Sequence, residues 1–133
     1  MDDALTGGCQ CGSVRYRIEV EPRGLTVCHC RGCQRQSGSA FGMSLDVASD
    51  AFRLVSGKLT SFTAECDSGR TKECAFCPRC GTRIFHEGEW GKSIKAGTLD
   101  ETHDLAPDAH YWTDCKQGWV SIPESTSTFA DDG

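Results

Sequence analysis

The stretch Cys28-His29-Cys30-Arg31-Gly32-Cys33 places three thiols within six residues, and the fold prediction for the whole chain starts from it. Alternate side chains of an extended backbone share a face, and Gly32 permits a turn that returns the third sulfur to the same point. The spacing therefore predicts a cup of three sulfurs. Structural zinc sites usually take four protein ligands, whereas catalytic zinc sites take three and leave one position for water or substrate.

A second group of cysteines is divided between two distant parts of the sequence. Gly7-Gly8-Cys9-Gln10-Cys11-Gly12 presents two thiols among glycines, which leave the backbone free to curl around a metal. Phe76-Cys77-Pro78-Arg79-Cys80-Gly81 is a knuckle in which the second sulfur folds back beside the first. A thioredoxin-type dithiol requires a following helix, whereas residues 82–86 have the pattern of a strand, so metal binding is favoured. Spacing alone leaves open whether the knuckle joins the first two cysteines or completes the cup.

Short alternating segments separated by glycine turns predict an all-β domain. We expect strands at 14–20, 41–47, 59–66, 71–76, 82–86, 94–99 and 119–122, a capped turn at 49–52, and a short helical turn at 34–39 that Gly38 ends. A hairpin turn at 67–70 places Cys74 opposite Thr63 and Cys66 opposite Thr71, with the two thiols on opposite faces. Residues 125–133 are expected to form a loose tail.

The length and the cysteine content indicate one intracellular domain. A chain of 133 residues fits a single domain, and its ten cysteines fall just below the density of a secreted disulfide scaffold. The first twelve residues contain no apolar run, and no later segment approaches the length of a membrane span. We therefore expect a cytoplasmic protein without membrane association, whose reduced thiols bind metal.

The acidic charge argues against a nucleic-acid partner. The formal charge is −5 with neutral cysteines, and binding two Zn²⁺ through seven thiolates would lower it to −8. Such a surface repels phosphate backbones unless a local basic patch overrides it. The candidates for such a patch are Arg31, Arg35, Arg53, Arg70, Lys72, Arg79 and Arg83. We interpret them as solvated charges on strands and turns.

The order of the motifs resembles a known family. Gly-x-Cys-x-Cys-Gly before a Val-Arg-Tyr strand, then Cys-His-Cys-x-x-Cys, Phe-Cys-x-x-Cys-Gly and Ala96-Gly97-Thr98-Leu99-Asp100 are similar to the glutathione-dependent formaldehyde-activating enzyme family, which also includes centromere protein V. The similarity runs from about Gly7 to Ile122. It implies a β-tent fold of small antiparallel sheets stapled by zinc, in a single domain over residues 1–133 with its core at about 7–122.

The resemblance also implies a division of the cysteines between two zinc ions. A structural zinc would be held by Cys9, Cys11, Cys77 and Cys80, and a catalytic zinc by Cys28, Cys30 and Cys33. A clip that joins residues 9 and 80 would close a long loop and stabilise a domain with a small core. We expect the three-cysteine site to hold its metal less firmly and to be occupied only in part.

The activity implied by the resemblance is that of a zinc-dependent carbon–sulfur lyase similar to S-(hydroxymethyl)glutathione synthase. Such an enzyme adds glutathione or another small thiol to formaldehyde or a related small aldehyde, through a thiolate that attacks the aldehyde carbon. Arg31 and Arg35 are predicted to bind substrate, because they flank the cup in sequence and could receive a carboxylate. His29, between two ligands, is expected to point away from the metal.

Two other functions stay open at this point. One is a non-catalytic, zinc-stapled module that binds protein or chromatin. The other is a thiol or zinc sensor that uses the remaining cysteines, Cys66, Cys74 and Cys115, which we otherwise expect to be buried or half-buried free thiols. The sequence does not define an oligomeric state.

Overall fold

The computed structural model describes residues 4–65 and 69–131. Within these residues the chain forms eleven strands, one α-helix and three short 3₁₀ helices. The strands are β1 (Leu5–Gly8), β2 (Arg15–Ile18), β3 (Gly24–Cys28), β4 (Gly42–Val47), β5 (Phe52–Ser56), β6 (Thr60–Glu65), β7 (Thr71–Phe76), β8 (Arg83–Gly88), β9 (Gly91–Lys95), β10 (Ala109–Tyr111) and β11 (Ser127–Thr128). The helices are α1 (Arg31–Ser37), η1 (Ser49–Ala51), η2 (Ala96–Thr98) and η3 (Thr113–Cys115).

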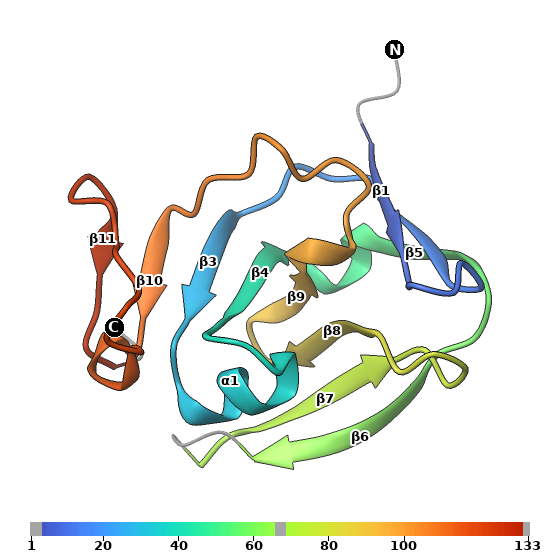
Figure 1. Ribbon diagram of the computed structural model, residues 1–133. Helices are drawn as coiled ribbons and strands as arrows, with labels where there is room; N and C mark the ends of the chain where they lie inside the picture. The colour runs from blue at the N-terminus through green and yellow to red at the C-terminus, as the bar shows by residue number, and fades with distance from the viewer. Residues whose placement is uncertain (1–3, 66–68, 132–133) are drawn as a thin grey trace.

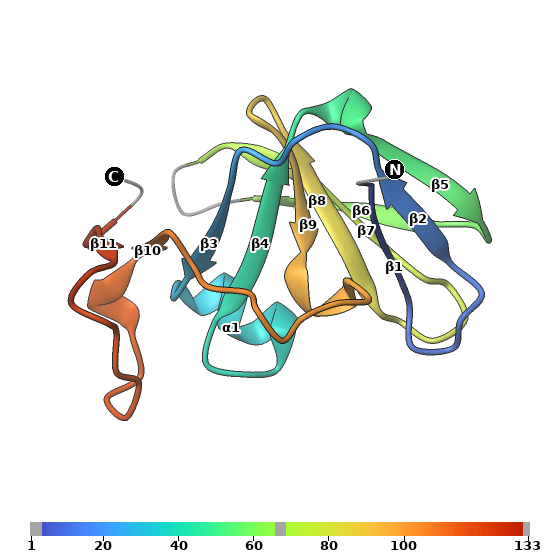
Figure 2. The same cartoon turned by 90° about the horizontal axis from the view of Figure 1, so that it is seen from above.

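Two sheets of unequal size contain the strands (Figure 1). The small sheet has the order β1-β2-β5, and the large sheet has the order β11-β10-β3-β4-β9-β8-β7-β6. Figure 2 shows the small sheet at one end of the molecule and β10 with β11 at the other. The all-β prediction is therefore confirmed. One detail differs from an antiparallel arrangement, because β10 runs parallel to both β3 and β11.

The core lies between the two sheets. Tyr16 of the small sheet packs in one cluster with Leu45 and Ile94 of the large sheet. The Tyr16 ring stacks on Phe52 with ring centroids 5.1 Å apart, and its hydroxyl lies 2.6 Å from the Thr98 hydroxyl. Burial of these apolar side chains is the main favourable contribution to folding.

The opposite face of the large sheet is polar, and it forms the surroundings of the candidate site. Successive side chains of a strand point to opposite faces, so the alternation that buries Leu45 in the core turns Asp46 to the other side. The register extends this polar face across the sheet, because Asp46 lies opposite Ser93 and Ser93 lies opposite His86. On β3, Thr26 belongs to the same face, since its hydroxyl donates to the Asp46 carboxylate.

Several element boundaries differ from the sequence prediction. Neither β1 nor β5 is predicted, because one is rich in glycine and threonine and the other lacks a clear alternation. The strand expected at 94–99 is β9, which ends at Lys95 before η2, and no strand forms at 119–122. Helix α1 begins at Arg31, earlier than expected, but it ends as predicted at Gly38, whose φ is 64°.

Part of the predicted loose tail is ordered. Ser127 of β11 pairs with Ala109 of β10, and the Phe129 N–H donates to the His110 carbonyl at 2.9 Å. The Phe129 ring also stacks on Tyr111 with ring centroids 4.8 Å apart. The expectation of a loose tail is therefore wrong for residues 127–129, which cover the outer edge of β10.

The hairpin of β6 and β7 has a register one residue away from the predicted one. Glu65 lies opposite Thr71, and Phe62 rather than Thr63 lies opposite Cys74. The connection between the strands is thus one residue longer than a turn at 67–70. Cys66 lies outside the described residues, and so does its predicted position.

Candidate metal centres and substrate cavity

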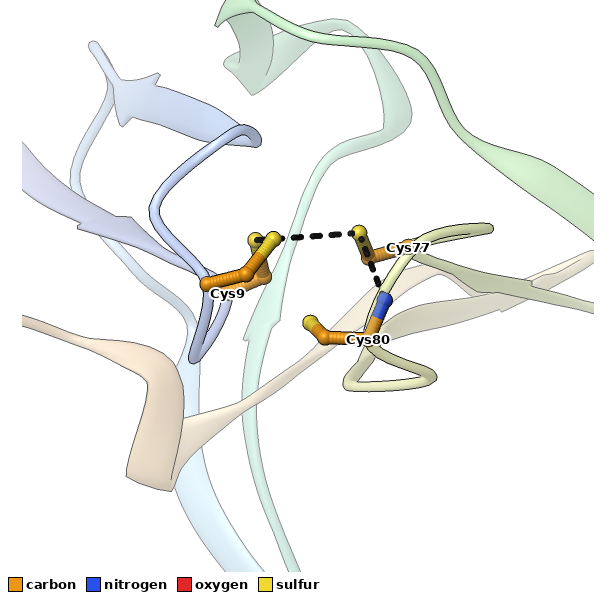
Figure 3. A group of neighbouring side chains, drawn as sticks. Cys9, Cys77 and Cys80 are labelled. Carbon is orange, nitrogen blue, oxygen red and sulfur yellow. Dashed lines mark hydrogen bonds between the residues drawn. The ribbon is translucent and has the colours of Figure 1, made fainter.

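Four cysteines from distant parts of the chain meet at one point, and Figure 3 labels three of them, Cys9, Cys77 and Cys80. The Sγ atoms of Cys9, Cys11, Cys77 and Cys80 all lie within 4.8 Å of one another. The first two come from the loop after β1 and the other two from the knuckle after β7, so the group links the small sheet to the large one. Gly81 permits the knuckle, because its φ of 80° is accessible to glycine at little cost. The structure thus places the knuckle with the first two cysteines.

The spacing of the four sulfurs fits a tetrahedral metal site. Zinc–sulfur bonds of about 2.3 Å place tetrahedral sulfurs about 3.8 Å apart. Here the Sγ of Cys11 lies 3.5 Å from that of Cys9 and 3.9 Å from that of Cys77. This four-cysteine group could therefore hold a metal ion such as zinc.

Hydrogen-bond donors surround two of these sulfurs, those of Cys9 and Cys80, and the pKa of each of these two thiols is lowered. The backbone N–H of Val14 donates to the Cys9 Sγ at 3.2 Å, and the Ser13 hydroxyl lies within 3.8 Å of the same sulfur. At the knuckle, the Thr82 hydroxyl and then its backbone N–H lower the pKa of Cys80 to about 5. Thiolates are the form in which cysteine binds metals.

A second group consists of Cys28, Cys30 and Cys33, whose sulfurs also lie within 4.8 Å of one another. Cys28 is the last residue of β3, and Cys30 caps α1 by accepting the N–H of Cys33 at 3.3 Å. The third sulfur is therefore returned by the first turn of a helix and not by a glycine turn alone. The predicted cup of three sulfurs is present in the structure.

The thiols of this cup differ in pKa, so they do not share the negative charge equally. Hydrogen bonds from Cys28 and then Cys30 lower the pKa of the Cys33 thiol, and the positive charge of Lys95 acts in the same direction. Contact with the other two cysteines raises the pKa of Cys28. Lys95 is only 9% exposed, and its Nζ has no hydrogen-bond partner among the described residues. Its charge is therefore available to offset that of the thiolates.

A cavity of about 380 Å³ opens beside the cup, and all three of its cysteines line that cavity. The other polar and charged residues that line it are Thr26, Ser44, Glu65, Arg70, Lys72, His86, Ser93 and Asp46, and its aromatic residues are Trp90, Tyr111 and Trp112. Cavities of this size in proteins take small molecules. We refer to it below as the cysteine cavity.

His86 is a neutral side chain within this cavity. It is 8% exposed, and burial, followed by the positive charges of Lys72 and Lys95, holds its pKa well below the usual range. Its Nδ1 has no hydrogen-bond partner in the described part of the chain. At neutral pH it can therefore take part in hydrogen bonds without carrying a charge.

The structure does not bring the two predicted substrate-binding arginines to the cysteine cavity. Arg31 and Arg35 line a different pocket, and Arg31 donates to the Gln34 side chain at 2.6 Å. Each is two residues from Cys33, and two residues correspond to about 200° around an α-helix. They therefore face away from the sulfur that the helix contributes to the cup.

Sequence reasoning missed most of the other residues of the cavity. It interpreted Arg70 and Lys72 as solvated charges, although both line the cavity. It also assigned no function to Asp46, because a polar residue that alternates with buried ones such as Leu45 is typical of a solvent-facing side chain. The sequence feature that could have indicated Asp46 is the polar face of the 41–47 strand. That face can be recognised as a cavity wall only when the residues of the opposite wall are known.

The other cysteines stand apart from both groups. Cys74 is buried and Cys115 is half-buried, and all nine cysteines of the described residues are free. Both match the expected burial of these thiols, while Cys66 is not among the described residues. His29 is fully buried, and its Nε2 lies 2.8 Å from the Nδ1 of His110.

No helix in the described ranges is both long enough and apolar enough to cross a membrane.

The fold and the site together define a β-sheet protein with two cysteine groups suited to metal ions, one of them open to a cavity. Residues 4–115 match the family described as glutathione-dependent formaldehyde-activating enzyme, and the chain belongs to that family. A protein of Halomonas elongata, provisionally named as a glutathione-dependent formaldehyde-activating enzyme, is 30% identical over 89% of this chain and 80% of its own length.

Proposed function

We propose that this protein is a zinc-dependent enzyme of the carbon–sulfur lyase type, which adds a small thiol to a small aldehyde in the manner of S-(hydroxymethyl)glutathione synthase. Glutathione and formaldehyde are the substrates that the family name suggests. The observation that carries the proposal is that all three sulfurs of the cup line one cavity of small-molecule size. A module that binds protein or chromatin would not require such a cavity.

In this proposal the two cysteine groups have different roles. The structural zinc would be held by Cys9, Cys11, Cys77 and Cys80, and the catalytic zinc by Cys28, Cys30 and Cys33. Bound at the cup, zinc would supply an open coordination position and would favour the thiolate form of a substrate thiol at neutral pH. Four ligands complete a tetrahedral site, so only the cup would have such a position.

The cavity residues would bind and orient the two substrates. Arg70 and Lys72 are the cations that line the cavity, and they would receive the carboxylates of a peptide thiol. The buried charge of Lys95 would offset the negative charge of the cup. His86, being neutral, would donate a hydrogen bond to the aldehyde oxygen as negative charge develops there.

The reaction is an addition that needs no oxidant or reductant. A bond forms between the thiol sulfur and the aldehyde carbon, and the π electrons of the carbonyl group move to its oxygen. The oxygen then takes up one proton, which balances the proton that the thiol gives up. Holding both substrates in one cavity converts an encounter in solution into a reaction between oriented neighbours.

Exchange NMR between ¹³C-labelled formaldehyde and S-(hydroxymethyl)glutathione would test this function, because the reaction is reversible and also proceeds without an enzyme. The zinc-loaded protein should accelerate the exchange, Cys33→Ser should abolish the acceleration, and Cys115→Ser should retain it, since Cys115 belongs to neither cysteine group. An exchange rate in the presence of the parent protein that equals the uncatalysed rate would contradict the proposal.

Cobalt substitution provides a separate measurement of thiol binding. Addition of glutathione should strengthen the sulfur-to-metal absorption, and S-methylglutathione should not, because it cannot supply a thiolate. The absence of any response to thiols would mean that the cup does not accept a fourth sulfur.

We further propose that the protein works in the cytoplasm. Its nine described cysteines are free, and a reducing compartment keeps thiolates available for metals. The catalytic zinc would be held less firmly than the structural one and would be present only in part of the molecules.

A further inference from the structure

The Asp46 carboxylate lies in the cysteine cavity and forms no ion pair with a basic side chain of the described residues. The Ser93 hydroxyl donates to one oxygen of Asp46 at 2.9 Å, and the Thr26 hydroxyl donates to the other at 3.1 Å. Both donors are neutral, and in the described ranges no basic side chain forms an ion pair with Asp46. The carboxylate is thus held in place by two hydroxyl groups, while the positive charges of Lys95 and Arg23 act on it without forming an ion pair.

An aromatic side chain is fixed beside this carboxylate. The indole N–H of Trp90 donates to the Ser93 hydroxyl at 2.9 Å, so Trp90, Ser93 and Asp46 form one hydrogen-bonded series. Tyr111 and Trp112 line the same cavity. A carboxylate among aromatic rings is a suitable environment for an ammonium group, because both the charge and the ring faces attract a cation.

The burial of Asp46 also favours a cationic ligand. Burial raises the pKa of this carboxyl group, and the hydrogen bonds from Ser93 and Thr26, together with the positive charges of Lys95 and Arg23, offset the effect only in part. An ammonium ion that enters the cavity would form the direct ion pair that no described side chain forms with this carboxylate.

The strand register gives the distance between the carboxylate and the cup. Thr26 and Cys28 share one face of β3, and two residues along a strand span about 7 Å. The Asp46 carboxylate accepts a hydrogen bond from Thr26, which gives the shorter estimate of its distance from the cup. Along β4 the estimate is longer, because Asp46 is four residues, or about 13 Å, from Gly42, the residue that pairs with Cys28. The ammonium site therefore lies on the order of 10 Å from the cup.

We propose that Asp46, with Trp90 beside it, binds the free amino group of the thiol substrate. This inference rests on the proposed function and specifies its thiol. The substrate class is an extended peptide thiol whose amino group is separated from the sulfur by most of its length, with its carboxylates near Arg70 and Lys72. Glutathione has this arrangement. Cysteine is too short to reach both ends, since its amino group and sulfur are on adjacent carbon atoms.

The test compares glutathione with its N-acetyl derivative, which has the same thiol and carboxylates but no ammonium group. Calorimetry on the metal-loaded protein should show that glutathione binds at least roughly tenfold more tightly than its N-acetyl derivative. A hydrogen bond to a charged group contributes enough free energy for a difference of that size. Asp46→Asn should reduce the affinity for glutathione to that for the derivative and should change binding of the derivative little. Asp50→Asn is the matched control, because Asp50 is an exposed residue of η1 outside the cavity.

The possible outcomes separate this inference from the function on which it rests. If both thiols bind the parent protein equally well, or if Asp46→Asn retains the full preference for glutathione, the ammonium site is refuted and the proposed function stands. If neither thiol binds the metal-loaded parent protein, both the ammonium site and the proposed function are refuted. The comparison of the two ligands needs no variant, so the test remains decisive even if Asp46→Asn fails to fold.

Discussion

The Nε2 atom of His29 lies 2.8 Å from the Nδ1 atom of His110, and the two residues are 81 positions apart in the sequence. The backbone N–H of His29 also donates to the Tyr111 carbonyl at 3.0 Å. Because His29 stands between Cys28 and Cys30, these hydrogen bonds attach the cup to β10. The same strand supplies Tyr111 to the wall of the cysteine cavity.

Replacement of His110 by alanine should therefore destabilise the protein. His29 is fully buried, and its Nδ1 already lacks a partner within the described residues, so the change would leave both ring nitrogens unpaired. The free energy of unfolding should fall by about 1–3 kcal/mol. Urea unfolding of the metal-loaded protein would measure this, with His103→Ala, at an exposed position, as the control. Equal stability of the two variants would mean that the histidine pair contributes nothing.

The two cysteine groups should respond differently to the loss of one sulfur. Cys80→Ser removes a ligand from the group that joins the two sheets, so the variant should lose one zinc and much of its cooperative unfolding transition. Cys33→Ser should also lose one zinc but should remain folded. Elemental analysis and thermal unfolding would show the difference, with Cys115→Ser, at a half-buried position outside both groups, as the control. If all the variants unfold like the parent, the assignment of the two roles is wrong.

Removal of metal by a chelator should proceed in two steps. The cup offers three protein ligands and lies in a cavity, whereas the other group offers four ligands, so the cup should lose its zinc first. Zinc release followed with a colorimetric chelator should show a fast phase of at most one metal per chain and then a slow phase. Cys33→Ser should lack the fast phase. A single phase that releases both metals would contradict unequal binding.

Stability above pH 10 should depend on Tyr16. Burial raises the pKa of its hydroxyl to about 12, whereas an unfolded tyrosine titrates near 10. The raised pKa contributes stability that is fully present below about pH 10 and is lost as the pH rises towards about 12. Between about pH 8 and pH 11, the free energy of unfolding of Tyr16→Phe should therefore fall by about 1 kcal/mol less than that of the parent protein. Parallel pH profiles from urea unfolding would show that Tyr16 does not titrate differently in the folded state.

The elements that sequence reasoning predicted well are those with a strong local signal. Alternation identified the strand that became β4, and Gly38 ended the only α-helix of the described residues, as predicted. The cup was predictable because its three thiols are close in sequence and are oriented by local backbone geometry alone.

The features that could not be predicted depend on tertiary pairing. β11 is two residues long and exists only because it pairs with β10, which no local pattern indicates. Arg31 and Arg35 flank the cup in sequence, yet the helix turns them away from Cys33. Asp46 is the opposite case, because it is distant from the cup in sequence but lines the same cavity. Its position follows from the register of β4 with its neighbours, which a single sequence does not specify.

The parallel pairing of β10 with β3 also sets the time at which the site can form during synthesis. Tyr111 lies opposite Cys28, so a nascent chain that has reached the Cys77–Cys80 knuckle still lacks one wall of its cavity. Contacts between residues so far apart in sequence carry a high entropic cost of loop closure and form late in folding. A chain released before residue 111 could contain every cysteine of both groups and still have no enclosed place in which to bind a substrate.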